Sequence, residues 1–185
     1  MKSKRIAGQK AVMRDVVRYS DRLVVMTAKA GSILREIYGA PAERIVRIPH
    51  GIPDVAFADP ALFKERYGLE GRLVLLTFGL LSPGKGIEVM LRGLPRVVRR
   101  HPETTYVILG ATHPSLLRQE GDAYRDSLER MVVELGLSDH VLFHNRYVSL
   151  EELCGYLCAT DVYVTPYHNP DQITSGTLAY AMGTG

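Results

Sequence analysis

The chain has 185 residues, of which 46% are hydrophobic and 23% charged, and its formal net charge is +3. This composition is typical of a globular domain, and the small, dispersed charge argues against a dedicated nucleic-acid surface. No apolar run approaches the roughly 20 residues that span a bilayer, and no apolar segment follows the basic N-terminus as it would in a secretory signal. The presence of only two cysteines favours a reducing, cytoplasmic setting.

The first part of the chain predicts one βαβ unit with a preceding helix. We expect a helix over 5–18, a buried strand over 22–27, a helix over 28–38 that ends at Gly39, and a short strand over 45–49. Residues 50–54 are expected to form a turn or hinge, and 55–71 a looser, partly helical connector.

From residue 73 onward, strand and helix patterns alternate. Strands are predicted at 73–78, 105–109, 141–144 and 161–165, and helical patterns follow each of them. The helix after Lys85 carries a clear apolar stripe, although Pro95 lies inside it and is expected to kink it or to remove one backbone hydrogen bond. The next helix covers about 124–135, a third begins at the capping box of Ser149 and Glu152, and a fourth starts near Thr174.

Repeated βα units of this length predict an α/β fold with a Rossmann-like, doubly wound parallel sheet and right-handed crossovers. A doubly wound sheet normally continues with another strand, so we expect this fold to be truncated at its C-terminus.

The segment 73–87, with the sequence LVLLTFGLLSPGKGI, predicts an anion site. A buried strand ends at Gly79, and a short loop with Ser82 and Gly84 leads to Lys85 and Gly86 at the start of a helix. Backbone N–H groups and the helix dipole would face an anion beyond the carboxyl end of the strand, and the lysine adds a positive charge. The expected ligand is a phosphate or diphosphate; a solvated lysine is the alternative.

Two further segments supply candidate ligand contacts. The start of the last helix offers hydroxyl groups and backbone N–H groups to a second phosphate oxygen, and its candidates are Gln172, Ser175, Gly176 and Thr177. Simple N-capping is the alternative there. After the third strand, Arg146 is placed to bind a phosphate bidentately, or else to pair with Glu151 or Glu152 at the surface.

Other features favour structural roles. Cys154 and Cys158 lie four residues apart on a helix, but no neighbouring pair of ligands completes a metal site, so we expect buried thiols and no bound metal. His113 is expected to contact a ligand or to fill a turn. A basic helical face is expected to be solvated rather than bound to nucleic acid or membrane; it comprises Arg92, Arg96, Arg99 and Arg100.

The order of these motifs resembles the C-terminal half of a GT-B glycosyltransferase of the large retaining group often called family 4. The resemblance rests on the linker-like turn at 48–52, the glycine-lysine loop at 78–86, the strand with its terminal glycine at 106–110, and the segments 161–166, 175–176 and 181–185. It covers roughly residues 20–185.

The resemblance implies that residues 1–54 are a remnant of the acceptor domain with the interdomain linker, and that 55–185 form an incomplete donor-binding domain. The implied function is transfer of a sugar, with retention, from a nucleoside diphosphate sugar to a hydroxyl of an unknown carbohydrate or lipid-linked acceptor. Peripheral membrane association is compatible with such an acceptor. The donor is a substrate, so no separate cofactor is implied. The chain has no Asp-x-Asp pair, which favours a metal-independent reaction.

Three positions depart from the family pattern. The family's phosphate-binding arginine would fall at Leu80, and its paired glutamates would fall at Gln172 and Tyr180. No catalytic residue is therefore assigned, and we expect the isolated chain to be inactive. The alternative is a non-catalytic nucleotide-sugar binding module. A dinucleotide-dependent oxidoreductase fits poorly, because Val89 stands where the third glycine of the G-x-G-x-x-G turn belongs.

Overall fold

The computed structural model describes residues 2–56, 58–169 and 171–184. The chain divides into two compact units, one of residues 1–51 with 171–176 and the other of residues 52–170 with 177–185. The division after residue 51 falls within the linker predicted at 50–54, whereas the grouping of 171–176 with the first unit was not expected. Among the described residues, no helix is long and apolar enough to cross a membrane.

The first unit contains the predicted βαβ element. Its elements are α1 (Lys2–Tyr19), β1 (Leu23–Val25), α2 (Ala28–Tyr38), the 3₁₀ turn η1 (Ala42–Arg44) and β2 (Ile45–Arg47). The two strands are parallel, with Leu23 paired to Ile45. The hydroxyl of Thr27 caps α2 by accepting a bond from the Ala30 N–H at 3.1 Å, and Gly39 ends the helix in the left-handed conformation, as predicted.

The second unit is built on a four-stranded parallel sheet with the order β5-β4-β3-β6. The strands are β3 (Leu73–Phe78), β4 (Thr104–Leu109), β5 (Val141–His144) and β6 (Val162–Tyr163). The helices are α3 (Pro60–Tyr67), α4 (Ile87–Val98), α5 (Pro114–Glu120), α6 (Ala123–Glu134), α7 (Leu150–Cys158) and α8 (Gly176–Gly183), and the 3₁₀ turn η2 (Pro83–Lys85) precedes α4.

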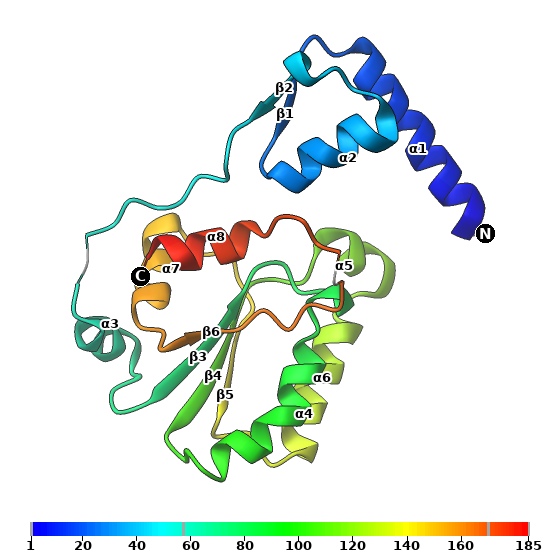
Figure 1. Ribbon diagram of the computed structural model, residues 1–185. Helices are drawn as coiled ribbons and strands as arrows, with labels where there is room; N and C mark the ends of the chain where they lie inside the picture. The colour runs from blue at the N-terminus through cyan, green and yellow to red at the C-terminus, as the bar shows by residue number, and fades with distance from the viewer. Residues whose placement is uncertain (1, 57, 170, 185) are drawn as a thin grey trace. The chain divides into compact units, whose positions relative to one another are not determined.

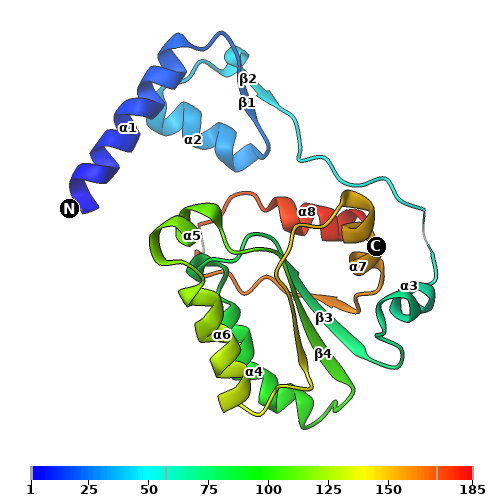
Figure 2. The same ribbon diagram turned by 180° about the vertical axis from the view of Figure 1, so that it is seen from behind.

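Helices cover both faces of this sheet, which confirms the predicted doubly wound architecture. In Figures 1 and 2, α4 and α6 lie on one face of the sheet, and α3, α7 and α8 lie on the other. Leu75, Tyr106 and Ile108 pack with α4 and α6, whereas Leu76 and Val107 pack with α7 on the opposite face. All six residues of β4 are buried, because that strand is central in the sheet and covered on both sides.

The observed elements differ from the predicted ones mainly at their ends. The strands predicted at 22–27, 45–49 and 161–165 are shorter, and α4 continues through Pro95 to Val98. Helix α5 was not predicted: it starts directly at Pro114, and the ring of His113 caps it by accepting a bond from the Ser115 N–H at 3.2 Å. His113 therefore caps a helix, a role that the sequence had not indicated, and its contact with a ligand stays a prediction.

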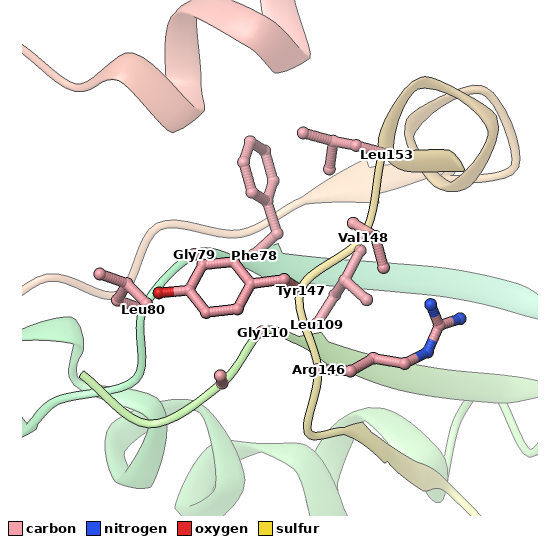
Figure 3. Close-up of a pocket in the computed structure, with 10 residues that line it drawn as sticks. Phe78, Gly79, Leu80, Leu109, Gly110, Arg146, Tyr147, Val148 and Leu153 are labelled. Carbon is pink, nitrogen blue, oxygen red and sulfur yellow. The ribbon is translucent and has the colours of Figure 1, made fainter. Parts of the chain in front are cut away.

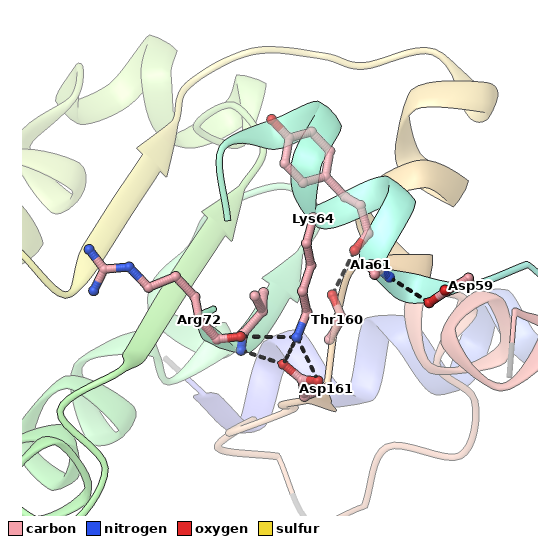
Figure 4. Close-up of polar contacts among 8 residues, drawn as sticks. Asp59, Ala61, Lys64, Arg72, Thr160 and Asp161 are labelled. Carbon is pink, nitrogen blue, oxygen red and sulfur yellow. Dashed lines mark hydrogen bonds and ion pairs between the residues drawn. The ribbon is translucent and has the colours of Figure 1, made fainter. Parts of the chain in front are cut away.

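A charged contact fixes the start of β6 against α3 (Figure 4). The Nζ of Lys64 donates to both carboxylate oxygens of Asp161, at 2.9 and 2.7 Å, and to the carbonyl oxygen of Arg72 at 2.9 Å. The Val74 N–H donates to the same carboxylate at 2.7 Å. This cluster ties the edge strand to β3, and the chain that leaves the edge strand leads into the candidate site.

Candidate functional site

The carboxyl ends of β3 and β4 meet at two glycines. Gly79 has φ +120° and Gly110 has φ +141°, and a Cβ added at Gly110 would lie only 2.2 Å from the carbonyl oxygen of Gly79. The Gly79 N–H also donates to the carbonyl oxygen of Leu109 at 2.9 Å. Only glycine fits such an approach, so the sheet edge at this point presents backbone rather than side chains.

The loop after Gly79 is held against neighbouring segments on both sides. The Leu81 N–H donates to the carbonyl oxygen of Ala111 at 2.9 Å, and the turn η2 follows, preceded by Ser82. Gly86, with φ +65°, joins this turn to α4, and a Cβ there would lie 1.9 Å from the carbonyl oxygen of Pro166. Gly86 thus allows the loop after β6 to approach the start of α4.

Lys85 points back toward the end of β3. Its Nζ lies 3.4 Å from the position that a Cβ would take at Gly79, donates to the hydroxyl of Tyr167 at 3.0 Å, and lies 4.3 Å from the centroid of the Tyr167 ring. The Tyr167 hydroxyl is also 2.6 Å from the Oγ1 of Thr177, in the first turn of α8. The structure therefore brings together three residues predicted from the sequence, Gly79, Lys85 and Thr177.

A small apolar cavity of about 140 Å³ adjoins the two glycines (Figure 3). It is formed at the carboxyl ends of β3, β4 and β5 and the start of α7, and its lining residues are Phe78, Gly79, Leu80, Leu109, Gly110, Ala111, Arg146, Tyr147, Val148 and Leu153. Leu80, at the position of the family's arginine, contributes an apolar wall here. Open crevices beyond the carboxyl ends of parallel strands are the usual ligand sites of such sheets.

Arg146 lies at the edge of this cavity, but its guanidinium is paired with Glu152. Its two terminal nitrogens contact the two carboxylate oxygens, one pair at 2.8 Å (Nη1 to Oε2) and the other closer still (Nη2 with Oε1). This hydrogen bonding raises the pKa of Arg146 and lowers that of Glu152. The surface pairing left open by the sequence is thus the arrangement in the structure, and a phosphate contact by Arg146 stays a prediction.

The remaining predicted candidates lie in two segments of the chain. Ser82 and Gly84 precede Lys85 in the loop described above. Gln172, Ser175 and Gly176 belong to the segment 171–176 of the first unit, where the Gln172 side-chain amide donates to the carbonyl oxygen of Thr174 at 3.0 Å. Their binding roles stay predictions.

Both cysteines are free thiols on α7. Cys154 is buried and Cys158 half-buried, and burial raises the pKa of both thiols. Across residues 2–56, 58–169 and 171–184, no group of three His, Cys, Asp or Glu side chains could hold a metal ion.

Sequence reasoning missed Tyr167. Its partner Lys85 is 82 positions away, and no local motif marks the tyrosine. The available signal was its place just after a predicted strand, at the edge of the sheet where ligands bind.

The sheet order and the helices on both faces define a doubly wound α/β domain, with a cavity at the carboxyl ends of its strands. Residues 61–173 match the family model described as "Glycosyl transferases group 1". The chain belongs to this family.

Curated relatives of this chain are glycosyltransferases. The chain is 35% identical, over 68% of its length and 31% of the relative's, to a GDP-mannose-dependent alpha-(1-6)-phosphatidylinositol monomannoside mannosyltransferase of Mycolicibacterium smegmatis. It is 31% identical to a D-inositol 3-phosphate glycosyltransferase of Kineococcus radiotolerans, over 88% of this chain and 38% of the relative. The chain thus spans roughly a third of the length of these relatives.

Solved structures share the fold. Anabaena HepE in complex with UDP and glucose matches with a TM-score of 0.68 and 18% identity, over 87% of this chain and 43% of that one. Sucrose-phosphate synthase from Thermosynechococcus elongatus matches with a TM-score of 0.70 and 22% identity, over 90% of this chain and 40% of that one. These likenesses confirm the predicted fold class, which is that of the C-terminal part of GT-B glycosyltransferases.

Proposed function

We propose that this chain binds the nucleoside diphosphate sugar donor of a glycosyltransferase, with the diphosphate next to Lys85. The proposal rests on the position of the Lys85 Nζ, which lies 3.4 Å from the place that a Cβ of Gly79 would take. The same nitrogen donates to the Tyr167 hydroxyl, which in turn contacts the hydroxyl of Thr177. A cation at the start of a helix is electrostatically unfavourable by itself, and an anion between it and the backbone N–H groups removes that cost.

The apolar cavity at the ends of β3, β4 and β5 is proposed to take the nucleobase. Its walls are apolar side chains and its floor is the backbone of Gly79 and Gly110, which suits a flat ring that is recognised by backbone groups. The names of known relatives support a nucleotide-sugar donor: one relative is GDP-mannose-dependent, and HepE was solved with UDP and with UDP-glucose.

The proposed reaction transfers a hexose to an acceptor hydroxyl with retention of configuration. The bond between the anomeric carbon and the diphosphate oxygen breaks, and a bond between the same carbon and the acceptor oxygen forms. The proton of the acceptor hydroxyl passes to the leaving diphosphate or to solvent, and negative charge develops on that diphosphate. Lys85 and the helix dipoles at the starts of α4 and α8 would stabilise that charge in place of a metal ion. The acceptor is proposed to be a carbohydrate or lipid-linked hydroxyl, as the phosphatidylinositol mannoside relative suggests.

A second candidate is a nucleotide-sugar binding module without transferase activity. Tyr180, at the position of a family glutamate, is half-buried and packs against the core of the second unit instead of offering a carboxylate. Leu80 likewise replaces a cation with an apolar wall. Transfer by the full-length protein from a radiolabelled donor, or its complete absence despite tight nucleotide binding, decides between these candidates.

Calorimetry tests the binding proposal directly. UDP, GDP and ADP are titrated into the chain, and we expect at least one of them to bind. Lys85→Ala should weaken that binding about tenfold, because it removes a charge-assisted contact to phosphate. Lys29→Ala, on the exposed surface of α2 in the first unit, is the matched control and should bind like wild type. Failure of all three nucleotides to bind overturns the proposal.

A further inference from the structure

The loop after β6 is attached to the start of α4 at three points around Tyr167. The His168 N–H donates to the carbonyl oxygen of Gly84 at 3.2 Å, and the Nε2 of His168 is 2.7 Å from the Oε1 of Glu88. On the other side of Tyr167, the carbonyl oxygen of Pro166 approaches Gly86 so closely that only glycine fits there. The backbone of Tyr167 is thus fixed from both sides.

Glu88 is itself held in place. Tyr124 of α6 donates its hydroxyl hydrogen to the Oε2 of Glu88 at 2.7 Å, so the carboxylate joins α4, α6 and the 166–168 loop. A side chain on a loop anchored in this way has little freedom to move away from its neighbours. The anchoring therefore fixes the direction in which Tyr167 projects.

The side chain of Tyr167 in turn fixes the lysine of the candidate site. Its hydroxyl accepts a hydrogen bond from the Lys85 Nζ at 3.0 Å, its ring lies 4.3 Å from the same nitrogen, and its hydroxyl is 2.6 Å from the Oγ1 of Thr177. A lysine side chain loses rotamer entropy when it is immobilised, and this loss opposes ligand binding. Because Tyr167 holds the amine beside Gly79 before any ligand arrives, part of that cost falls on folding rather than on binding.

We propose that Tyr167 is a positioning residue for the donor diphosphate, acting through Lys85. An ammonium group has three N–H donors, and the Tyr167 hydroxyl takes one, which orients the others toward the crevice beside Gly79. With Leu80 at the position of the family's arginine, correct placement of Lys85 matters more for binding the anion. The inference rests on the proposed function, since it concerns the same site.

The test is calorimetry on the full chain with UDP and GDP and with the corresponding monophosphates. Tyr167→Phe keeps the ring and removes only the hydroxyl, and it should weaken diphosphate binding about tenfold, as expected for loss of one hydrogen bond to a charged group. Monophosphate binding should change less than twofold, because we place Lys85 against the second phosphate, which a monophosphate lacks. Tyr67→Phe is the matched control: it removes a hydroxyl that bonds the carbonyl oxygen of Glu152 in α7, away from Lys85.

A double-mutant cycle separates positioning from a merely structural role. In a Lys85→Met background, Tyr167→Phe should have no further effect on diphosphate affinity, because there is no amine left to position. An equal loss in both backgrounds, an unchanged affinity of Tyr167→Phe, or equal losses for mono- and diphosphates would overturn the inference. If wild type binds neither diphosphate, the proposed function fails first, and that result differs from any of these.

Discussion

Removing the carboxylate of Asp161 should destabilise the second unit by about 2–3 kcal/mol. Asp161→Ala takes away the acceptor of the Val74 N–H and leaves Lys64 with only the carbonyl oxygen of Arg72. A hydrogen bond to a charged group contributes about 1.5–3 kcal/mol, whereas a partly exposed ion pair adds at most about 1 kcal/mol. The ion pair is assigned at most about 1 kcal/mol because both side chains reach solvent, with 16% of Lys64 and 33% of Asp161 exposed.

Thermal and urea unfolding followed by far-UV circular dichroism measure this loss. The expected fall in melting temperature is on the order of 5–10 °C. Asp161→Asn is the matched control, because its side-chain oxygen still accepts from Val74, and it should cost only about 1 kcal/mol. If Asp161→Ala unfolds within about 0.5 kcal/mol of wild type, the cluster does not hold β6 in place and the reasoning is wrong.

Three further predictions follow from single positions. Gly86→Ala should lower the free energy of unfolding by about 3 kcal/mol or more, because the backbone there is left-handed and the new methyl group would clash with the carbonyl oxygen of Pro166. Gly84→Ala is the control: it has open space around it and should cost under about 0.5 kcal/mol. Equal losses for the two variants would contradict this. Burial raises the pKa of Glu88, but hydrogen bonds to that carboxylate outweigh it and hold the pKa below its ordinary value of 4.5. Its stabilisation is therefore present at neutral pH and lost on acidification, so the stability gap between wild type and Glu88→Gln should close as the pH falls below about 4.5, and a pH-independent gap would refute this. Arg146→Met should lower nucleotide affinity by less than about threefold, because Glu152 already binds the guanidinium. A tenfold loss of affinity measured by calorimetry would contradict this and would support the predicted contact between Arg146 and a phosphate.

The sheet could be predicted from the sequence because its strands are short apolar runs followed by glycine or polar residues. The strand 73–78 was predicted with its observed bounds, and four parallel strands alternate with helices as expected. Helix α5 escaped prediction because it is only seven residues long and lacks an apolar stripe, although a proline at its first position was a usable signal.

The candidate site was predictable where the chain itself brings the residues together. The glycines and Lys85 lie in one continuous strand-loop-helix segment, so local pattern was enough to find them. The contact of Lys85 with Tyr167, and that of Arg146 with Glu152, depends on side-chain directions across loops. Sequence spacing does not fix those directions, and it left both arrangements of Arg146 open.

The most direct test of the account is to locate the bound diphosphate by backbone amide NMR of the isotope-labelled chain. On addition of UDP or GDP, we predict that the signals of Gly79, Gly86 and Thr177 shift most, and that signals from residues 8–47 of the first unit stay in place. Shifts centred on that first unit, with these three amides unmoved at saturating nucleotide, would contradict a diphosphate site beside Lys85.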